Sequence, residues 1–391
     1  MSVGIQIPRT RIGVLGVITI AAYGCWFYAF GVLLDPIIAD TGWSEPALAS
    51  AFSASILIGG VGSIAGGWLL DRFGSRSVFL LAATVTLVAF QIAAGTSDVL
   101  VFAVSGAIGG GVIAALGFYH VTQTTAVRIS PGSTDRAIAV LTIWGAFASA
   151  IYMPISALLV GPLGWRSTLR ILTLSAAVAL IVGAIAVTTR TSEMPATRNV
   201  LGELKQSLTR STARRFLFAQ GLAGIGVATL LVYQVPAMTA AGLPLAAASF
   251  WAGARGFSQL FGRLPLMPIV RRLGVVGSLR LAYAATSLGT LVLAVAGNPW
   301  LAALYAVLAG FGIGATSPLV GMYSSEVFGA RSLGTAMGLI GMVFLVVGSI
   351  GPAAAGFIAE ATGSRAIPVA GAAVMTILAA AVIRPTPHTG R

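Results

Sequence analysis

Residues 67–76 read GWLLDRFGSR, a short polar turn between two long apolar stretches. The stretches, at about 47–70 and 77–96, are each long enough to cross ~30 Å of hydrocarbon as a helix, which takes about 20 apolar residues. Gly74 permits a tight turn, and the adjoining charges can lie at the membrane surface. The segment therefore predicts two membrane-spanning helices joined by a tight turn.

Apolar stretches of the same kind recur along the whole chain. Of its 391 residues 57% are apolar and 8% charged, and the mean hydropathy is +0.95. A soluble domain carries roughly 25% charged residues, so the composition excludes a water-soluble globule. Twelve spans are predicted at about 12–34, 47–70, 77–96, 99–126, 137–161, 166–188, 214–239, 245–270, 277–296, 300–322, 332–358 and 366–384.

The spans leave little chain for other functions. Twelve of them take roughly 240 to 280 residues, which is too much to leave room for a soluble catalytic domain. The sequence has no phosphate-binding lysine loop, no metal-ligand cluster and no Ser-His-Asp or Cys-His spacing. We therefore expect no enzymatic activity, no cofactor, no metal and no nucleic-acid partner. Cys25 is the single cysteine, so an intrachain disulfide is excluded.

Basic residues are distributed unevenly over the predicted loops. With a cytoplasmic N-terminus, the outer loops hold only Arg166, Arg170 and Arg365, and the remaining loops and both tails hold most of the other arginines. The positive-inside rule then places both termini in the cytoplasm. The net charge of +13 is explained as an orienting signal in a cell inner membrane rather than as a nucleic-acid footprint.

Two halves of the sequence resemble each other across one polar segment. Short motifs recur at offsets near 200 residues: Arg72-Phe73-Gly74 and Arg272-Leu273-Gly274, Gly117-Phe118-Tyr119 and Gly321-Met322-Tyr323, Gly164-Trp165-Arg166 and Gly363-Ser364-Arg365. This predicts a six-helix bundle over 1–188, a cytoplasmic linker over 189–213 and a second six-helix bundle over 214–391. A parallel repeat is typical of rocking transporters, whose substrate site lies near the midplane between the halves.

The turn at 67–76 resembles the signature loop of the major facilitator superfamily: glycine, three residues, Asp-Arg, one residue, glycine and then a basic residue. The resemblance covers the whole chain and implies an all-α membrane protein with twelve transmembrane helices in two pseudo-symmetric six-helix bundles. It also implies secondary active transport by alternating access. The loop residues expected to form a conformational latch are Gly67, Asp71, Arg72, Gly74 and Arg76.

For two of the loop residues, Gly67 and Asp71, physical chemistry suggests a specific role. Gly67 is expected to let helix backbones approach closely, and Asp71 to pair with a basic group or a helix end in one access state. The second-half copy has Arg271 in place of Asp71, so any latch there is built differently. The alternative is a loop whose charges only orient the chain.

A narrower resemblance concerns the substrate. Thr41-Gly42-Trp43-Ser44, Arg136-Ala137-Ile138 and Gly164-Trp165-Arg166 resemble motifs of the bacterial monocarboxylate and oxalate/formate porters, which move small organic anions. Those porters carry a substrate-binding arginine on helix 8, and the position that matches it is Arg263. Helix 4 lacks the intramembrane arginine of many drug/proton antiporters. Export of drugs or other small molecules is therefore the alternative rather than the first hypothesis.

Helix 8 also predicts a site from its own residues. An ionisable side chain in hydrocarbon costs at least ~2.5 to 3.5 kcal/mol, so it marks a candidate functional site. Arg255, Gln259 and Arg263 share one helical face at i, i+4 and i+8, and Arg255 lies ~15 Å from the outer end. Two guanidinium groups on one face suit a carboxylate. The alternative is that either arginine snorkels or braces a neighbouring helix.

Three further residues complete the predicted site. Tyr28 and Tyr119 are expected to donate hydrogen bonds to the substrate. His120 is the one histidine in a predicted span, so it is the candidate for proton coupling; the alternative is a neutral histidine bonded between helices. The expected function is transport of a small organic anion, and a monocarboxylate is the first hypothesis for that anion. The protein is expected to act as a monomer, and its expected partners are the substrate, protons and the lipid bilayer.

Overall fold

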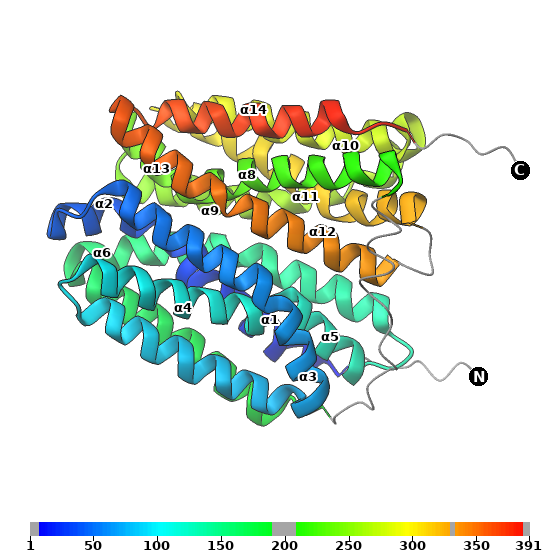
Figure 1. Cartoon of the computed structure of the whole chain (residues 1–391), viewed down its shortest axis with the longest axis horizontal. Helices are drawn as coiled ribbons and strands as arrows, with labels where there is room; N and C mark the ends of the chain where they lie inside the picture. Colours follow the sequence, from blue (N-terminus) through cyan, green and yellow to red (C-terminus); the bar gives the residue numbers. More distant parts are fainter. Residues whose placement is uncertain (1–7, 190–208, 329–332, 386–391) are drawn as a thin grey trace, which may run out of the picture. The chain divides into compact units, whose positions relative to one another are not determined.

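The computed structural model describes residues 8–189, 209–328 and 333–385, and these residues form helices and connecting turns without a β-strand (Figure 1). The chain divides into two compact units, Met1–Met194 and Pro195–Arg391. Most of the predicted linker, residues 190–208, lies outside the described residues. Within the described residues of the second unit, the helix predicted to start at 214 begins at Ser211.

The N-terminal unit makes six helical passes. The first pass is interrupted by a π-helical segment at its middle, and the fourth is broken at Phe118. The elements are α1 (Arg9–Tyr23), η1 (Gly24–Tyr28), α2 (Ala29–Thr41), α3 (Glu45–Gly95), α4 (Val99–Gly117), α5 (Tyr119–Ile129) and α6 (Thr134–Ala186). Two passes are merged in α3 across Gly74 and two in α6 across Gly164.

The C-terminal unit also makes six passes, of which the fifth is divided at Ser349. Its elements are α8 (Ser211–Ala240), α9 (Leu245–Arg263), α10 (Leu266–Leu293), α11 (Pro299–Phe328), α12 (Leu333–Gly348), α13 (Ile350–Thr362) and α14 (Ala366–Val382). Within this unit α14 packs against both α8 and α10.

These helices account for the twelve predicted spans. Within the described ranges, eight helices are long and apolar enough to cross a membrane, and two of them, of 51 residues each, hold two passes. The remaining passes are α9 and α14. The span expected over 245–270 is shorter in the structure, where its helix ends at Arg263. Pro265 explains the break, because it has no N–H to donate to the helix and its own backbone, at φ −86° and ψ 11°, leaves the helical conformation.

One of the repeated motifs, Arg72-Phe73-Gly74 and Arg272-Leu273-Gly274, has the same glycine conformation in both units. Gly74 has φ 73° and ψ 172°, and Gly274 has φ 68° and ψ 173°. Both values fall where L side chains are disfavoured and glycine is not. The two units therefore turn between successive passes with the same conformation, although the second copy of the loop lacks the aspartate.

An aromatic cluster forms the centre of the N-terminal unit. Trp26 is fully buried, donates from Nε1 to Ser55 Oγ at 3.0 Å, and packs against the rings of Phe30, Phe52, Phe90 and Phe102. A side chain at Gly110 would meet the indole of Trp26 at 2.5 Å. The absence of a side chain at Gly110 therefore permits the close contact of α4 with η1.

Close backbone contact also holds α9 against α11 in the C-terminal unit. A Cβ atom at Gly310 would collide with the Arg255 carbonyl, and one at Gly314 with the Gln259 carbonyl. The two helices therefore approach at the same helical turns that carry the predicted site residues of α9, and small residues at such contacts are typical of membrane helix pairs.

Candidate substrate site and signature loop

Arg255 lies at the centre of a buried polar cluster that joins three helices. Its guanidinium Nε donates to Gln234 Oε1 of α8 at 3.0 Å, and the same oxygen accepts from the Tyr305 hydroxyl of α11 at 2.7 Å. The Gln234 amide nitrogen donates to the Leu231 carbonyl at 3.1 Å. Arg255 is 1% exposed, and Gln234 and Tyr305 are fully buried.

The charge of Arg255 is not neutralised within the described residues. No carboxylate there lies within ion-pair distance of it, and its Nη2 has no hydrogen-bond partner there. Hydrogen bonds to Gln234 supply acceptor dipoles but no negative charge. A buried cation in this condition is costly, so the cluster can gain free energy from an anion.

The structure does not bring Arg263 into this cluster. Arg263 is the last residue of α9 and donates from Nε to the Gly314 carbonyl of α11 at 3.4 Å. A basic residue in the last helical turn also interacts favourably with the helix dipole. The three residues predicted on one face of α9 therefore differ in their surroundings. Arg255 is buried, Gln259 is half-buried, and Arg263 contacts the backbone of α11.

A separate cavity of about 280 Å³ lies within the C-terminal unit. Its polar lining includes Gln220, Tyr283, Thr286, Thr316 and Ser317, and its apolar lining includes Val227, Ile313 and Phe344. Gln220 donates to the Tyr283 hydroxyl at 2.9 Å. The lining holds no charged residue. Of these residues only Gln220 stands out in the sequence, as an amide inside an apolar run; the threonines and serine do not, because hydroxyl side chains are common in membrane helices.

In the N-terminal unit both predicted tyrosines, Tyr28 and Tyr119, lie near a third tyrosine, Tyr23. The ring of Tyr23 stacks on Phe118 at 3.7 Å between centroids and lies 5.4 Å from Tyr119 and 6.3 Å from Tyr28. The Tyr119 hydroxyl donates to the Thr142 carbonyl at 3.3 Å. The backbone is irregular next to both predicted tyrosines. Tyr28 is the last residue of the π-helical segment η1, and Tyr119 is the first residue of α5, after the break at Phe118.

His120 contacts the end of α4, next to the break in the fourth pass. Its Nε2 lies 2.7 Å from the Ala115 carbonyl, in the last turn of α4 before the break at Phe118. Carbonyls at the end of a helix have no partner within the helix, and the imidazole N–H can satisfy this one. This contact, from α5 to α4, matches the alternative stated for His120, a histidine bonded between helices.

In the signature loop Asp71 is paired within its own unit. An Asp71 oxygen accepts from Arg128 Nη2, and Arg128 Nη1 donates to the Leu70 carbonyl at 3.2 Å. Arg128 is in the last turn of α5, so the pair joins α3 to α5. The sequence predicted a basic partner for Asp71 but did not identify Arg128, which is distant in sequence.

The other loop residues differ in their surroundings. Arg72 and Arg76 are exposed, and the Arg72 guanidinium lies 5.4 Å above the Trp68 ring. The expectation for Gly67 is wrong: a Cβ there meets nothing within 4 Å, whereas one at Gly66 would collide with the Ala115 carbonyl. Gly66 faces α4, and Gly67 is one helical position away from that face.

Gly74 lies against the end of α6. A Cβ at Gly74 would be 2.7 Å from the Thr189 carbonyl. Beside it, Ser75 Oγ donates to the Val187 carbonyl at 2.6 Å and accepts from the Thr189 N–H at 3.0 Å. The turn therefore satisfies backbone groups after the last helix of its unit, which the sequence did not predict.

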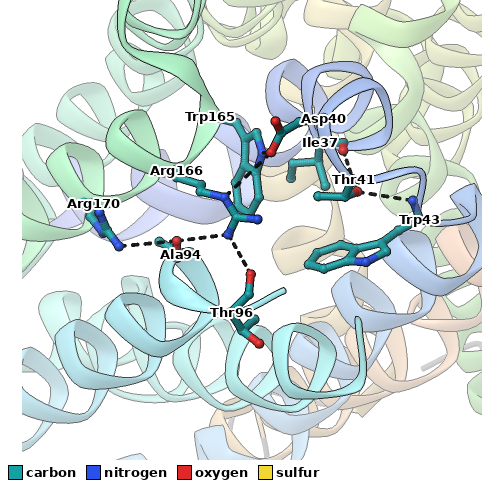
Figure 2. A network of polar contacts seen from close by, with 9 residues as sticks. All are labelled: Ile37, Asp40, Thr41, Trp43, Ala94, Thr96, Trp165, Arg166 and Arg170. Atoms are coloured by element: carbon teal, nitrogen blue, oxygen red, sulfur yellow. Dashed lines mark hydrogen bonds and ion pairs between the residues drawn. The ribbon is translucent and has the colours of Figure 1, made fainter. Parts of the chain in front are cut away.

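The opposite end of the N-terminal unit, called here the distal end, is joined by a second polar network (Figure 2). Trp165 Nε1 donates to Asp40 Oδ2 at 2.8 Å, and Arg166 Nε lies 3.7 Å from the same oxygen. Arg166 Nη1 donates to the carbonyls of Thr96 at 2.6 Å and Ala94 at 3.2 Å. Of the motifs that carried the narrower resemblance, Gly164-Trp165-Arg166 thus connects its own turn to the ends of α2 and α3.

Comparison with known proteins identifies the family. The Major Facilitator Superfamily matches residues 15–215 and 216–391. Because the matches cover most of the chain, the protein belongs to this superfamily, and it is a multi-pass membrane transporter rather than an enzyme. None of the curated proteins matches the chain in sequence.

Solved structures with a similar fold include several transporters. A mutant of the nucleoside transporter NupG is 13% identical, with a TM-score of 0.82 over 96% of this chain and 98% of that chain. A POT family transporter in complex with 5-aminolevulinic acid is 12% identical, with a TM-score of 0.72 over 96% and 95%. At these identities the likeness supports the fold alone.

Proposed function

We propose that the protein is a secondary active transporter of a small organic anion, most simply a monocarboxylate, which it moves by alternating access. The observation that supports this substrate class is Arg255: a fully buried guanidinium with no carboxylate partner and an unbonded Nη2 among the described residues. A bound carboxylate would supply both the missing charge and the missing acceptor.

The contacts of Arg255 suggest how binding proceeds. In the structure its Nε donates to Gln234, a neutral acceptor. A carboxylate can accept two parallel hydrogen bonds from one guanidinium, so it competes with the single bond from Nε. Gln234 then keeps the Tyr305 hydroxyl as its donor. Gln234 would act as a placeholder that the anion replaces when the helices rearrange.

The remaining predicted residues take supporting roles in this proposal. Gln259 and Arg263 position α9 and contact the substrate after rearrangement, and Tyr28 and Tyr119 provide hydrogen bonds from the N-terminal unit. His120 couples transport to protons by changing the bond that it makes at the break of α4. The ion pair of Asp71 and Arg128 acts as a latch for one access state, with both termini on the cytoplasmic side of the inner membrane.

A second candidate is an uncharged solute rich in hydroxyl groups. It is favoured by the cavity next to Gln220 and Tyr283, whose lining has hydrogen-bonding groups and no charge. Among the proteins of similar fold, NupG is described as a nucleoside transporter. The two candidates differ in the charge of the substrate, so one experiment can separate them.

The experiment is substrate exchange by purified protein in sealed liposomes. Vesicles are loaded in turn with a two- to four-carbon monocarboxylate, a nucleoside, a dipeptide or a cationic drug, and uptake of the same labelled compound is followed. We expect saturable exchange of the monocarboxylate and inhibition by other carboxylates. If the protein exchanges the nucleoside, the dipeptide or the drug but does not exchange the monocarboxylate, the proposal is wrong.

A further inference from the structure

A pocket of about 600 Å³ opens at the distal end of the N-terminal unit. It lies between the end of α2 and the turn in α6, and its lining includes Pro36, Asp40, Leu163, Trp165, Arg166 and Arg170. Figure 2 shows Asp40, Trp165, Arg166 and Arg170 around the network that joins these segments. None of these residues has a role in the transport mechanism proposed above.

The two arginines of the pocket have different surroundings. Arg166 is committed to the protein: it contacts Asp40, two backbone carbonyls and the ring of Trp165, over which its guanidinium lies at 4.4 Å. Arg170 is exposed, and the one hydrogen bond that its side chain makes within the described residues, from Nη2 to the Ala94 carbonyl, is 3.4 Å long. Arg170 therefore has donors available for a ligand.

The charges of the pocket favour a singly charged anion. Asp40 offsets Arg166, with which it forms an ion pair, and Arg170 remains as an uncompensated positive charge at the pocket wall. A guanidinium binds phosphate through two parallel hydrogen bonds. A phosphodiester, which carries one negative charge, matches both the geometry and the charge.

The apolar side of the pocket indicates where that phosphodiester comes from. Leu163 lines the pocket at the end of one pass of α6 and is 46% exposed, and Leu174, on the pass that follows the turn at Gly164, is 51% exposed. Such side chains belong to the hydrocarbon-facing surface of a membrane protein. A long arginine side chain near the end of a membrane-spanning helix reaches the level of the lipid headgroups, where a phosphodiester can accept its hydrogen bonds. A soluble anion would gain nothing from the exposed leucines.

We propose that this pocket binds one anionic phospholipid. Arg170 holds the phosphodiester, Arg166 and Trp165 form the wall behind it, and an acyl chain lies along Leu163. The lipid would fasten the end of α2 to the turn in α6, and it would stabilise the conformation of the three loops at the distal end. The proposal does not depend on which substrate the protein transports.

Native mass spectrometry of the purified full-length protein tests this with two lipids, phosphatidylglycerol and phosphatidylcholine. We expect one tightly retained phosphatidylglycerol and weak retention of phosphatidylcholine. Arg170→Gln removes the charge, and Ala39→Trp fills the pocket from an exposed position while leaving the charges in place. Each should weaken retention about tenfold, which corresponds to ~1.4 kcal/mol.

Arg365→Gln is the matched control. Arg365 occupies the corresponding turn of the C-terminal unit, so its loss changes the net charge equally and should leave the bound lipid in place. If all three variants lose bound phosphatidylglycerol equally, or if Ala39→Trp retains it, the lipid is attracted to the surface in general and the proposed binding in this pocket is wrong. Thermal stabilisation by inorganic phosphate but not by phosphatidylglycerol would overturn the lipid as its ligand. A misfolded variant is recognised by its elution profile and replaced by Arg170→Met.

Discussion

Gly66 and Gly67, at the start of the signature loop, have different structural roles. The rule that favours small residues at helix contacts led to the prediction for Gly67, because the rule does not give the direction of the helix face. In the structure Gly66 contacts the α4 backbone and Gly67 does not. For the same reason the pairing of Asp71 with Arg128 could not be derived from one sequence, since it requires the packing of α3 against α5.

Gly66→Ala is expected to destabilise the protein and Gly67→Ala to leave it unchanged. The added methyl at position 66 forces α3 away from the Ala115 carbonyl, and overpacking of this kind costs about 1–3 kcal/mol. Thermal unfolding of both variants in detergent measures the difference. Equal melting temperatures for the two variants would contradict the packing described for α3 and α4.

Asp71→Asn is expected to retain folding but slow turnover. The amide removes the charge that pairs with Arg128, and if the pair stabilises one access state by ~1.4 kcal/mol, its loss shifts the populations about tenfold. The check is the exchange rate in liposomes together with the accessibility of single cysteines on each side. Restored turnover in an exchanged pair, Asp71→Arg with Arg128→Asp, supports the latch, whereas unchanged exchange in Asp71→Asn reduces the aspartate to an orienting charge.

Corresponding helices of the two units are built differently where function is expected. The motif Gly117-Phe118-Tyr119 breaks the fourth pass, with Phe118 stacked on Tyr23, whereas α11 runs unbroken through Met322 and Tyr323. Tyr323 instead donates to the Arg384 carbonyl at 2.6 Å. Similar sequence thus predicted the repeat but not the break, because the break depends on an aromatic partner from α1.

The cluster formed by α8, α9 and α11 gives an element-scale prediction. Gln234→Leu leaves Arg255 and Tyr305 without their shared acceptor, and an unsatisfied buried group costs ~1–3 kcal/mol, more when charged. We expect lower thermal stability than in Gln220→Leu, which removes only a bond to a neutral tyrosine. Added carboxylate should stabilise Gln234→Leu more than the wild type.

The matched comparison decides that prediction. If carboxylate shifts the melting temperature of Gln220→Leu and Gln234→Leu equally, the amide of Gln234 is not a placeholder for the anion. If both variants are equally stable in the absence of ligand, the charge of Arg255 does not depend on Gln234.

At the scale of the whole molecule, much of the fold could be predicted from the sequence. Hydropathy, the period near 200 residues and the turn at 67–76 were sufficient for twelve passes and the family, because each hydrophobic segment must satisfy its backbone internally. The site was less predictable. Arg255 was found because a charge stands out in an apolar helix, but Tyr305 and Thr286 look like ordinary packing residues, and only tertiary contacts show their partners.

The orientation in the membrane is testable with single cysteines. In a Cys25→Ser background, Ser97→Cys at the distal end should react with an impermeant thiol reagent from outside intact cells, and Ser211→Cys only after permeabilisation. Both positions are exposed. The basis is the excess of arginine at the other end of the passes. The reverse pattern would contradict a cytoplasmic location of the termini.

Exchange of a labelled monocarboxylate by Arg255 variants in liposomes tests the central claim most directly. Arg255→Lys keeps the charge but loses the planar pair of donors, and Arg255→Met loses both; Arg263→Lys is the matched change at the other end of the same helix face. The account predicts that both Arg255 variants remain folded yet lose carboxylate affinity by about tenfold or more, the equivalent of ~1.4 kcal/mol, with a smaller loss in Arg263→Lys. Wild-type affinity in folded Arg255→Met would contradict it.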